Sequence, residues 1–191
     1  MPGTGKTEFC KASASRLKKE LFEVVFCDDD DSLNSLERFS SLICANALLE
    51  AKNSVILFDE VEDIFSKHSL SKALINHTLE ENRMPTFWLT NDVYSMDNAY
   101  IGRFDMVIEF KIPPKTKRKE LIKNYTKGAV CEKTINKPAK NKDIAPALIS
   151  SASKVLNTLK VADEKERNKL FTTLINANLN AQDKLRIERK V

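Results

Sequence analysis

PGTGKT, at residues 2–7, is the stretch that decides the fold. It matches the second part of a phosphate-binding loop, whose full pattern is G-x-x-x-x-G-K-[ST] after a buried strand. Glycines in such a loop turn successive backbone N–H groups toward an anion, and the helix that follows adds the positive end of its dipole. Lys6 is expected to reach the outer phosphates of a nucleotide, and Thr7 to bind Mg²⁺. The expected loop contacts come from Pro2, Gly3, Thr4 and Gly5.

Two carboxylates end a second diagnostic stretch, VILFDE at residues 55–60. Taken alone, PGTGKT is also compatible with a glycine turn before a helix, and VILFDE with a strand that runs into a turn. In this order and spacing the two motifs support each other. An uninterrupted apolar run suits a parallel strand covered on both faces, and ligands bind at the carboxyl ends of such strands. Asp59 is expected to hold Mg²⁺, and Glu60 to act as general base on the attacking water.

Two further polar residues occupy positions where they would help phosphate transfer. Asn91 ends the apolar stretch FWLTN and is expected to orient the attacking water; its alternative role is to open a turn before Asp92. Arg103, in YIGRFD, is expected to stabilise charge on the transferring phosphate. A structural role, in which Arg103 pairs with Asp105 or Glu109, is the alternative.

Composition describes an ordinary globular protein. The 191 residues are 42% apolar and 30% charged, enough to bury a core in one domain or one domain with a small appendage. No apolar run approaches the ~20 residues that span a bilayer, and the N-terminus has no secretory signal. The four cysteines form no C-x-x-C pair and indicate reduced thiols. We therefore expect a cytoplasmic protein with no membrane partner.

The charge distribution divides the chain. Residues 1–112 carry 12 Lys/Arg against 19 Asp/Glu, net −7, whereas residues 113–191 carry 19 against 8, net +11. The change falls at IPPKTKRKE, where two prolines stop any strand ladder. We place the domain boundary there. The basic part is suited to contact nucleic acid, an acidic neighbouring subunit or water, and lysines spread along helices favour the solvated face.

Hydrophobic periodicity predicts an α/β domain followed by a helical one. Buried strands alternating with amphipathic helices are typical of a parallel sheet with flanking helices. The predicted strands are residues 22–27, 54–60, 86–91 and 106–112, and the helices between them are 7–21, 32–52 and 68–82. Beyond Pro114 only helices are predicted, at 115–127, 143–160 and 163–178.

Together, PGTGKTEF, VILFDEVEDIF, FWLTND and YIGRFDMVIEF resemble the AAA+ ATPases of the P-loop NTPase superfamily, most closely bacterial members with L-F-D-E-V-E-D-x-F. The resemblance covers nearly the whole chain. It implies ATP with Mg²⁺ as ligands, a homo-oligomeric ring, usually a hexamer, and a helical lid over the nucleotide. Residue by residue it implies a Walker A pair (Lys6, Thr7), a Walker B pair (Asp59, Glu60), sensor 1 (Asn91), an arginine finger (Arg103) and, at the sensor 2 position, Lys154 in place of an arginine.

The chain departs from that family pattern in three ways. Many members carry two arginines near the finger, whereas here Ile101 and Gly102 precede a single Arg103. DDDDSLN, at residues 28–34, stands where translocating members have an aromatic–apolar–glycine loop, which argues against polypeptide threading. The leading glycine and the strand before it are missing from the sequence given. In the family that strand lies between the sensor 1 strand and the strand after the finger, so two inner edges would be unpaired. We therefore expect the 191-residue chain by itself to bind ATP weakly or not at all.

Three functional hypotheses follow. The first is an Mg²⁺-dependent ATPase that remodels a macromolecular partner, a protein in preference to a nucleic acid. The second is a nucleic-acid-associated ATPase, a loader or mobile-element helper, supported by the +11 charge of residues 113–191. The third is an inactive remnant of the fold that serves as an interaction module.

Overall fold

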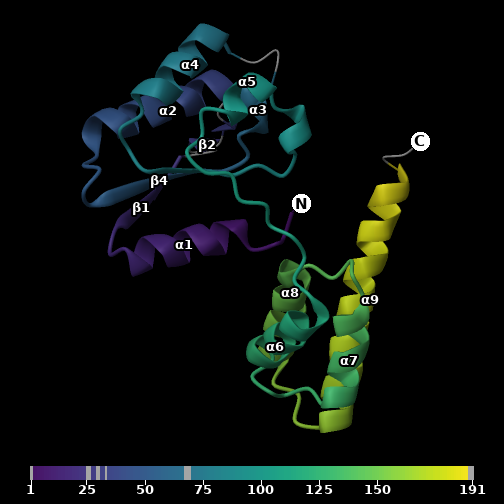
Figure 1. Ribbon diagram of the computed structural model, residues 1–191. Coiled ribbons are helices and arrows are strands. Elements are labelled where there is room, and N and C mark those ends of the chain that lie inside the picture. The colour runs from purple at the N-terminus through teal and green to yellow at the C-terminus, as the bar shows by residue number, and fades with distance from the viewer. Residues whose placement is uncertain (1, 25–26, 29–30, 33, 67–69, 189–191) are drawn as a thin grey trace. The chain divides into compact units, whose positions relative to one another are not determined.

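The computed structural model describes residues 2–24, 27–28, 31–32, 34–66 and 70–188 (Figure 1). The chain forms two compact units. One is Lys6–Glu109, and the other joins Met1–Gly5 to Phe110–Val191. Each unit has its own buried hydrophobic core.

A three-stranded parallel sheet organises the first unit. Its strands are β1 (Glu20–Glu23), β4 (Ser54–Phe58) and β5 (Thr86–Trp88), in the order β1-β4-β5. All five residues of the central strand β4 are buried, because helices cover both of its faces. The predicted α/β class with a parallel sheet is therefore confirmed. A short antiparallel hairpin, β2 (Cys27–Asp28) with β3 (Asp31–Ser32), holds the ends of the acidic run; Asp29 and Asp30 lie outside the described residues.

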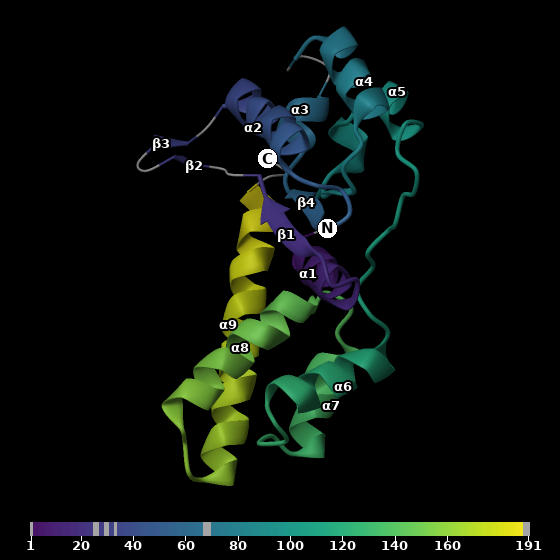
Figure 2. The same ribbon diagram turned by 90° about the vertical axis from the view of Figure 1, so that its left-hand side faces the viewer.

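Side-chain alternation along β4 assigns a different helix layer to each face (Figures 1 and 2). Leu57 packs with Cys10 of α1 (Lys6–Arg16) on one face. Ile56 and Phe58 face the larger core on the other side, which includes buried residues of α2 (Ser35–Leu48), α3 (Glu62–Phe65) and α4 (Lys72–Glu81). A 3₁₀ turn, η1 (Val93–Ser95), and α5 (Asn98–Ile101) follow β5.

The predicted strand at residues 106–112 is wrong. This segment belongs to no sheet of the described residues, and Met106, Val107 and Ile108 are 74%, 63% and 52% exposed. A strand requires a neighbour whose backbone groups complete its ladder. The outer edge of β5 pairs with no described strand, and no described strand lies beside residues 106–112 either. The apolar run alone therefore does not produce a strand here.

The second unit is a helical bundle, as expected for residues beyond Pro114. It contains α6 (Lys115–Tyr125), α7 (Glu132–Lys140), α8 (Pro146–Leu159) and α9 (Glu164–Glu188) around a core that includes Ile122, Ile149 and Phe171. Helix α7 has no counterpart among the predicted elements, because Pro138 within it is a poor helix signal. None of the described helices has the length and apolar content needed to cross a bilayer.

Candidate active site

The loop PGTGKT has the backbone of an anion nest. Gly3 and Gly5 adopt positive φ angles of +72° and +96°, and α1 begins immediately after them at Lys6. These conformations strongly favour glycine, and the first turn of α1 presents backbone N–H groups to the loop. A Cβ on Gly3 would lie 2.9 Å from the Cβ of Ala147, whose N–H donates to the Gly3 carbonyl at 3.0 Å. Position 3 is therefore restricted to glycine for two reasons, the positive φ angle and the close approach to Ala147.

Four of the predicted site residues meet in two pairs. Lys6 Nζ donates to Asn91 Oδ1 at 2.6 Å, and Thr7 Oγ1 donates to Asp59 Oδ2 at 3.2 Å. The pairs join the start of α1 to Asp59, which directly follows β4, and to Asn91, three residues after the end of β5. Parallel strands bring their carboxyl ends to one edge of the sheet, which is where α/β proteins bind ligands. The structure therefore collects a lysine, an amide, a hydroxyl and a carboxylate at that edge.

Glu60 completes the edge. Its backbone N–H donates to Asp59 Oδ1 at 2.8 Å, and its φ of +50° lies in the left-handed region. The side chain is exposed, and within the described part of the chain no hydrogen bond or ion pair involves its carboxylate. An exposed carboxylate beside the Thr7–Asp59 pair is placed to accept a proton from water.

Side-chain oxygens at this edge suit Mg²⁺. Thr7 Oγ1 and Asp59 Oδ2 are hard oxygen ligands, and they already lie 3.2 Å apart. No group of three or more His, Cys, Asp or Glu in the described ranges is arranged to hold a metal. Mg²⁺ normally keeps several waters and takes few protein ligands beside substrate phosphate. The Thr7–Asp59 pair therefore fits a nucleotide-bound Mg²⁺ and not a closed protein cage.

The loop that carries Asn91 depends on a residue that the sequence analysis missed. Glu62 Oε1 accepts hydrogen bonds from the backbone N–H of Asn91 and, at 3.1 Å, of Asp92. Burial acts to raise the pKa of Glu62, but these and other hydrogen bonds outweigh it, and the pKa is lowered overall. Glu62 is thus held as a carboxylate. The indication in the sequence that Glu62 belongs to the site was its position, three residues after Asp59.

Arg103 makes its hydrogen bonds to residues outside these two pairs. Arg103 Nε donates to Glu80 Oε1 at 3.1 Å, and an Nη1 hydrogen bond reaches the carbonyl of Ala99. The predicted structural alternative named Asp105 or Glu109 as its partner; the observed partner is Glu80 of α4. Lys154 is exposed on α8 of the helical unit.

Arg38 is the second residue that the sequence analysis missed. It is 4% exposed on α2 and donates to the carbonyls of Asp59 and Glu60 and to the carboxylate of Asp63. Helical spacing places it on the same stripe as buried Leu42. A lone cation within an apolar helix stripe was the signal that would have indicated a buried arginine whose charge is paired.

The reactivity of Cys10 tests whether α1 packs against the sheet. Its side chain is 1% exposed, and burial together with the negative charge of Asp59 raises the pKa of its thiol from 9.0 to about 11. At pH 8 it therefore holds about a hundredfold less thiolate than an ordinary thiol. In contrast, a hydrogen bond with the Thr134 hydroxyl lowers the pKa of the Cys131 thiol.

We expect iodoacetamide to alkylate Cys10 at least about a hundredfold more slowly than Cys131 at pH 8. The Cys10 rate should rise about tenfold for each pH unit until the pH approaches its raised pKa. Mass spectrometry of the two tryptic peptides measures each rate separately. Equal rates at pH 8 would show that Cys10 is not buried between α1 and the sheet.

Comparison with known proteins decides the family. The family model "ATPase family associated with various cellular activities (AAA)" matches residues 1–112, more than half of the chain. The chain belongs to the AAA family of ATPases. This confirms the family resemblance derived from the four motifs.

Several curated proteins are distant relatives of this AAA chain. A probable spastin homolog, spas-1, of Caenorhabditis briggsae is 28% identical over 144 residues, which cover 66% of the chain and 26% of that protein. The ATP-dependent zinc metalloprotease FtsH of Malacoplasma penetrans is 26% identical, over 71% of the chain and 18% of its own length. The replication factor C large subunit of Sulfolobus acidocaldarius is 26% identical, over 69% and 29%. The chain spans less than a third of each relative.

The same AAA fold is found among solved structures. The FIGL-1 AAA domain, crystallised in complex with ADP, matches with a TM-score of 0.63 and 17% identity, over 92% of this chain and 68% of that one. At this identity the match shows the fold. The match includes the helical region as well as residues 1–112.

Proposed function

We propose that this AAA chain is the catalytic part of an Mg²⁺-dependent ATP hydrolase. Residues 1–112 would form the nucleotide-binding domain and residues 113–191 its lid. The observation that carries the proposal is the pair of contacts Lys6–Asn91 and Thr7–Asp59 at the carboxyl edge of the sheet. Each contact joins a motif of the phosphate loop to a motif at the end of a strand, and both involve groups that phosphate transfer requires.

Each site residue has a defined task in the proposed reaction. The loop amides and Lys6 would bind the β- and γ-phosphates, and Lys6 would exchange its hydrogen bond to Asn91 for one to phosphate. Thr7 and Asp59 would hold Mg²⁺, which would neutralise charge on the phosphate oxygens. Glu60 would take a proton from a water that attacks the γ-phosphorus while the bond to the β–γ bridging oxygen breaks. Asn91, freed from Lys6, would orient that water.

Arg103 and Lys154 would act from outside this cluster. We propose that the chain assembles into a homo-oligomeric ring, in which Arg103 serves the nucleotide of the adjacent subunit. For this, Arg103 must release Glu80, which is possible at small cost because exposed ion pairs contribute about 0–1 kcal/mol. Lys154, as a point charge, would contact phosphate less specifically than an arginine. Remodelling of a protein partner is the proposed output of the cycle.

A nucleic-acid partner is the second candidate function. Lys115, Lys140 and Lys142 line one cavity of about 530 Å³ in the helical unit, together with Pro114. Arg118 also borders it, but its guanidinium is buried and bonded to the carbonyls of Ala139 and Pro113, so it is not one of the proposed anion-binding groups. None of the residues lining this cavity is acidic, so its field favours an anion. A DNA or RNA backbone is the polyanion that such a surface would bind.

Phosphate release tests the proposal. We use the longest in-frame translation product that contains this chain and measure ATP turnover with Mg²⁺ and with EDTA. Turnover that requires Mg²⁺ supports an ATPase, and its absence at saturating ATP contradicts it. Duplex and single-stranded DNA are then added at two salt concentrations. Stimulation that falls steeply with salt favours the nucleic-acid candidate over a protein substrate.

A further inference from the structure

The turn after β4 is held in an uncommon conformation. Glu60 has a φ of +50°, a region that costs a non-glycine residue free energy because its Cβ crowds the following carbonyl. Such a conformation persists only where the surroundings over-determine it. The hydrogen bond from Glu60 N–H to Asp59 Oδ1 is local to the turn and does not by itself explain why the backbone stays there.

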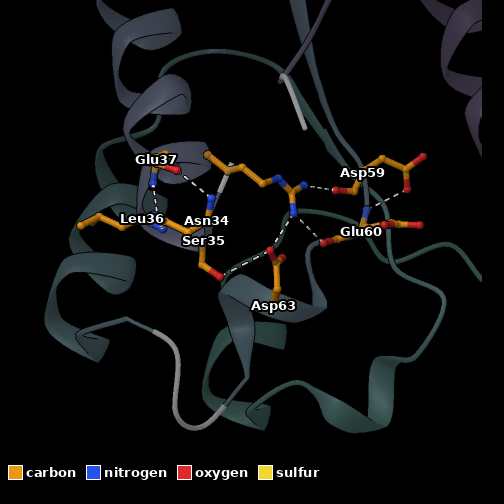
Figure 3. Close-up of polar contacts among 8 residues, drawn as sticks. Asn34, Ser35, Leu36, Glu37, Asp59, Glu60 and Asp63 are labelled. Carbon is orange, nitrogen blue, oxygen red and sulfur yellow. Dashed lines mark hydrogen bonds and ion pairs between the residues drawn. The ribbon is translucent and has the colours of Figure 1, made fainter. Parts of the chain in front are cut away.

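Arg38 of α2 donates hydrogen bonds to the backbone of this turn, whose residues Asp59 and Glu60 are labelled in Figure 3. Its Nη2 donates to the Asp59 carbonyl at 2.6 Å, and its Nη1 donates to the Glu60 carbonyl at 3.3 Å. The planar guanidinium bonds two successive carbonyls through a rigid fork of donors, whereas an ammonium group is a compact point charge whose three donors rotate. The guanidinium carbon also lies 4.9 Å from the centre of the Phe58 ring. The fork is therefore fixed against the last residue of β4 as well as the turn.

The charge of Arg38 is balanced inside the same cluster. Nη1 also donates to Asp63 Oδ2 at 2.7 Å, and the Ser35 hydroxyl donates to that oxygen at 3.4 Å. The helix that carries Arg38 begins with a capping box, in which Asn34 and Glu37 each bond to the other's backbone. The capping box fixes the helix end from which Arg38 extends. Because Asp63 pairs with the buried charge of Arg38, the guanidinium can form strong hydrogen bonds to the backbone carbonyls.

Because Arg38 fixes the carbonyls of Asp59 and Glu60, it also determines the direction of their carboxylates. In Figure 3 the carbonyl oxygens of Asp59 and Glu60 face the cluster around Asp63, while both carboxylates lie on the opposite side of the turn. On that side Asp59 meets Thr7. If the turn relaxed to a right-handed conformation, the Glu60 side chain would leave this direction.

We propose that Arg38 is a positioning residue, which holds Asp59 and Glu60 in the geometry that ATP hydrolysis needs. The proposal rests on the proposed function, because it assigns Asp59 and Glu60 the tasks given above. Arg38 itself touches neither nucleotide nor water in this scheme. Its effect reaches the reaction through the backbone of the Walker B turn.

Turnover measurements on Arg38→Met and Arg38→Lys form the first test. We expect Arg38→Met to lower kcat by about 10- to 100-fold and to change ATP affinity less than about threefold. Arg38→Lys keeps the charge beside Asp63 and should recover most of the melting temperature, but not kcat. Arg118→Met is the matched control, since Arg118 is also 4% exposed and also donates to backbone carbonyls, those of Ala139 and Pro113. It should lower the melting temperature without a comparable loss of kcat. Recovery of kcat in Arg38→Lys in step with stability would overturn the proposal.

A stability cycle on the 191-residue chain tests the same contact without turnover. Glu60→Gly removes the cost of the positive φ and should raise the melting temperature by about 2–4 °C. The single tryptophan, Trp88 of β5, reports unfolding of the unit that contains the turn. In an Arg38→Met background the turn is free to relax, so the gain from Glu60→Gly should vanish; in an Arg118→Met background it should persist. If Arg38→Met does not fold, Arg38→Lys takes its place.

An equal gain from Glu60→Gly in both the wild-type and Arg38 backgrounds would overturn the proposal, because Arg38 would then not maintain the conformation. Failure of the proposed function is separate from this result. A wild-type protein without ATP turnover would remove the hydrolysis role, whereas the stability cycle would still show whether Arg38 holds the turn.

Discussion

Glu60→Gln is expected to slow ATP turnover by about 10²- to 10⁴-fold, the usual contribution of a general base. Glutamine keeps the length and shape of glutamate but does not take a proton from water. The Arg38 hydrogen bonds are to backbone carbonyls, so they remain available in the variant. ATP affinity should therefore change by less than about threefold, because the loop, Lys6 and the Thr7–Asp59 pair are untouched. Phosphate release and binding of a fluorescent ATP analogue measure the two quantities.

Glu23→Gln is the matched control for this change. Glu23 is an exposed glutamate at the carboxyl end of β1, the strand next to β4, and it has no proposed role. Its substitution should leave turnover unchanged. Equal turnover in wild type and Glu60→Gln would contradict the enzyme hypothesis and favour a non-catalytic interaction module. A loss of ATP binding in Glu60→Gln would instead show that Glu60 supports the fold of the site.

The parts of the site that the sequence predicted share one physical cause. The uninterrupted apolar run at residues 55–58 had to be a strand buried on both faces, and β4 is buried along its whole length. Once β4 and β5 are parallel neighbours, the residues that follow them must lie at one edge. Asp59 and Asn91 were therefore placed near the phosphate loop by topology alone. In the structure Asn91 accepts a hydrogen bond from Lys6 and Asp59 accepts one from Thr7, and their roles in catalysis stay predictions.

What the sequence did not predict depends on partners far away in the chain. Residues 106–112 have a strand-like composition, but whether they form a strand depends on a neighbour that no described strand provides. The Glu80 partner of Arg103 lies 23 residues away and could not be selected from among the nearer carboxylates. Within the predicted helix at residues 7–21 the large apolar side chains Phe9 and Leu17 are exposed, whereas the small side chains Cys10 and Ala14 are buried.

Gly3→Ala is expected to weaken ATP binding by about 30- to 1,000-fold. The new Cβ meets two costs in the binding conformation. A φ of +72° costs an alanine ~1–2 kcal/mol. The approach of 2.9 Å to the Ala147 Cβ adds ~1–2 kcal/mol of overpacking, because a methyl on a helix has no flexible end to move aside. The loop would relax to an unstrained conformation and must regain the strained one to bind, so a total of ~2–4 kcal/mol appears as lost affinity.

Two further variants separate these costs. Gly102→Ala is the control: Gly102 has a φ of −71°, and its Cβ would meet nothing within 4 Å, so ATP affinity should not change. Gly3→Ala combined with Ala147→Gly removes the close contact but keeps the positive φ, so it should recover only part of the lost affinity. Isothermal calorimetry with ATP and Mg²⁺ on the longest in-frame product measures all three. Wild-type affinity in Gly3→Ala would mean that the loop does not wrap phosphate in the conformation seen here. Full recovery in the double variant would mean that the contact with α8, and not the backbone angle, restricts position 3 to glycine.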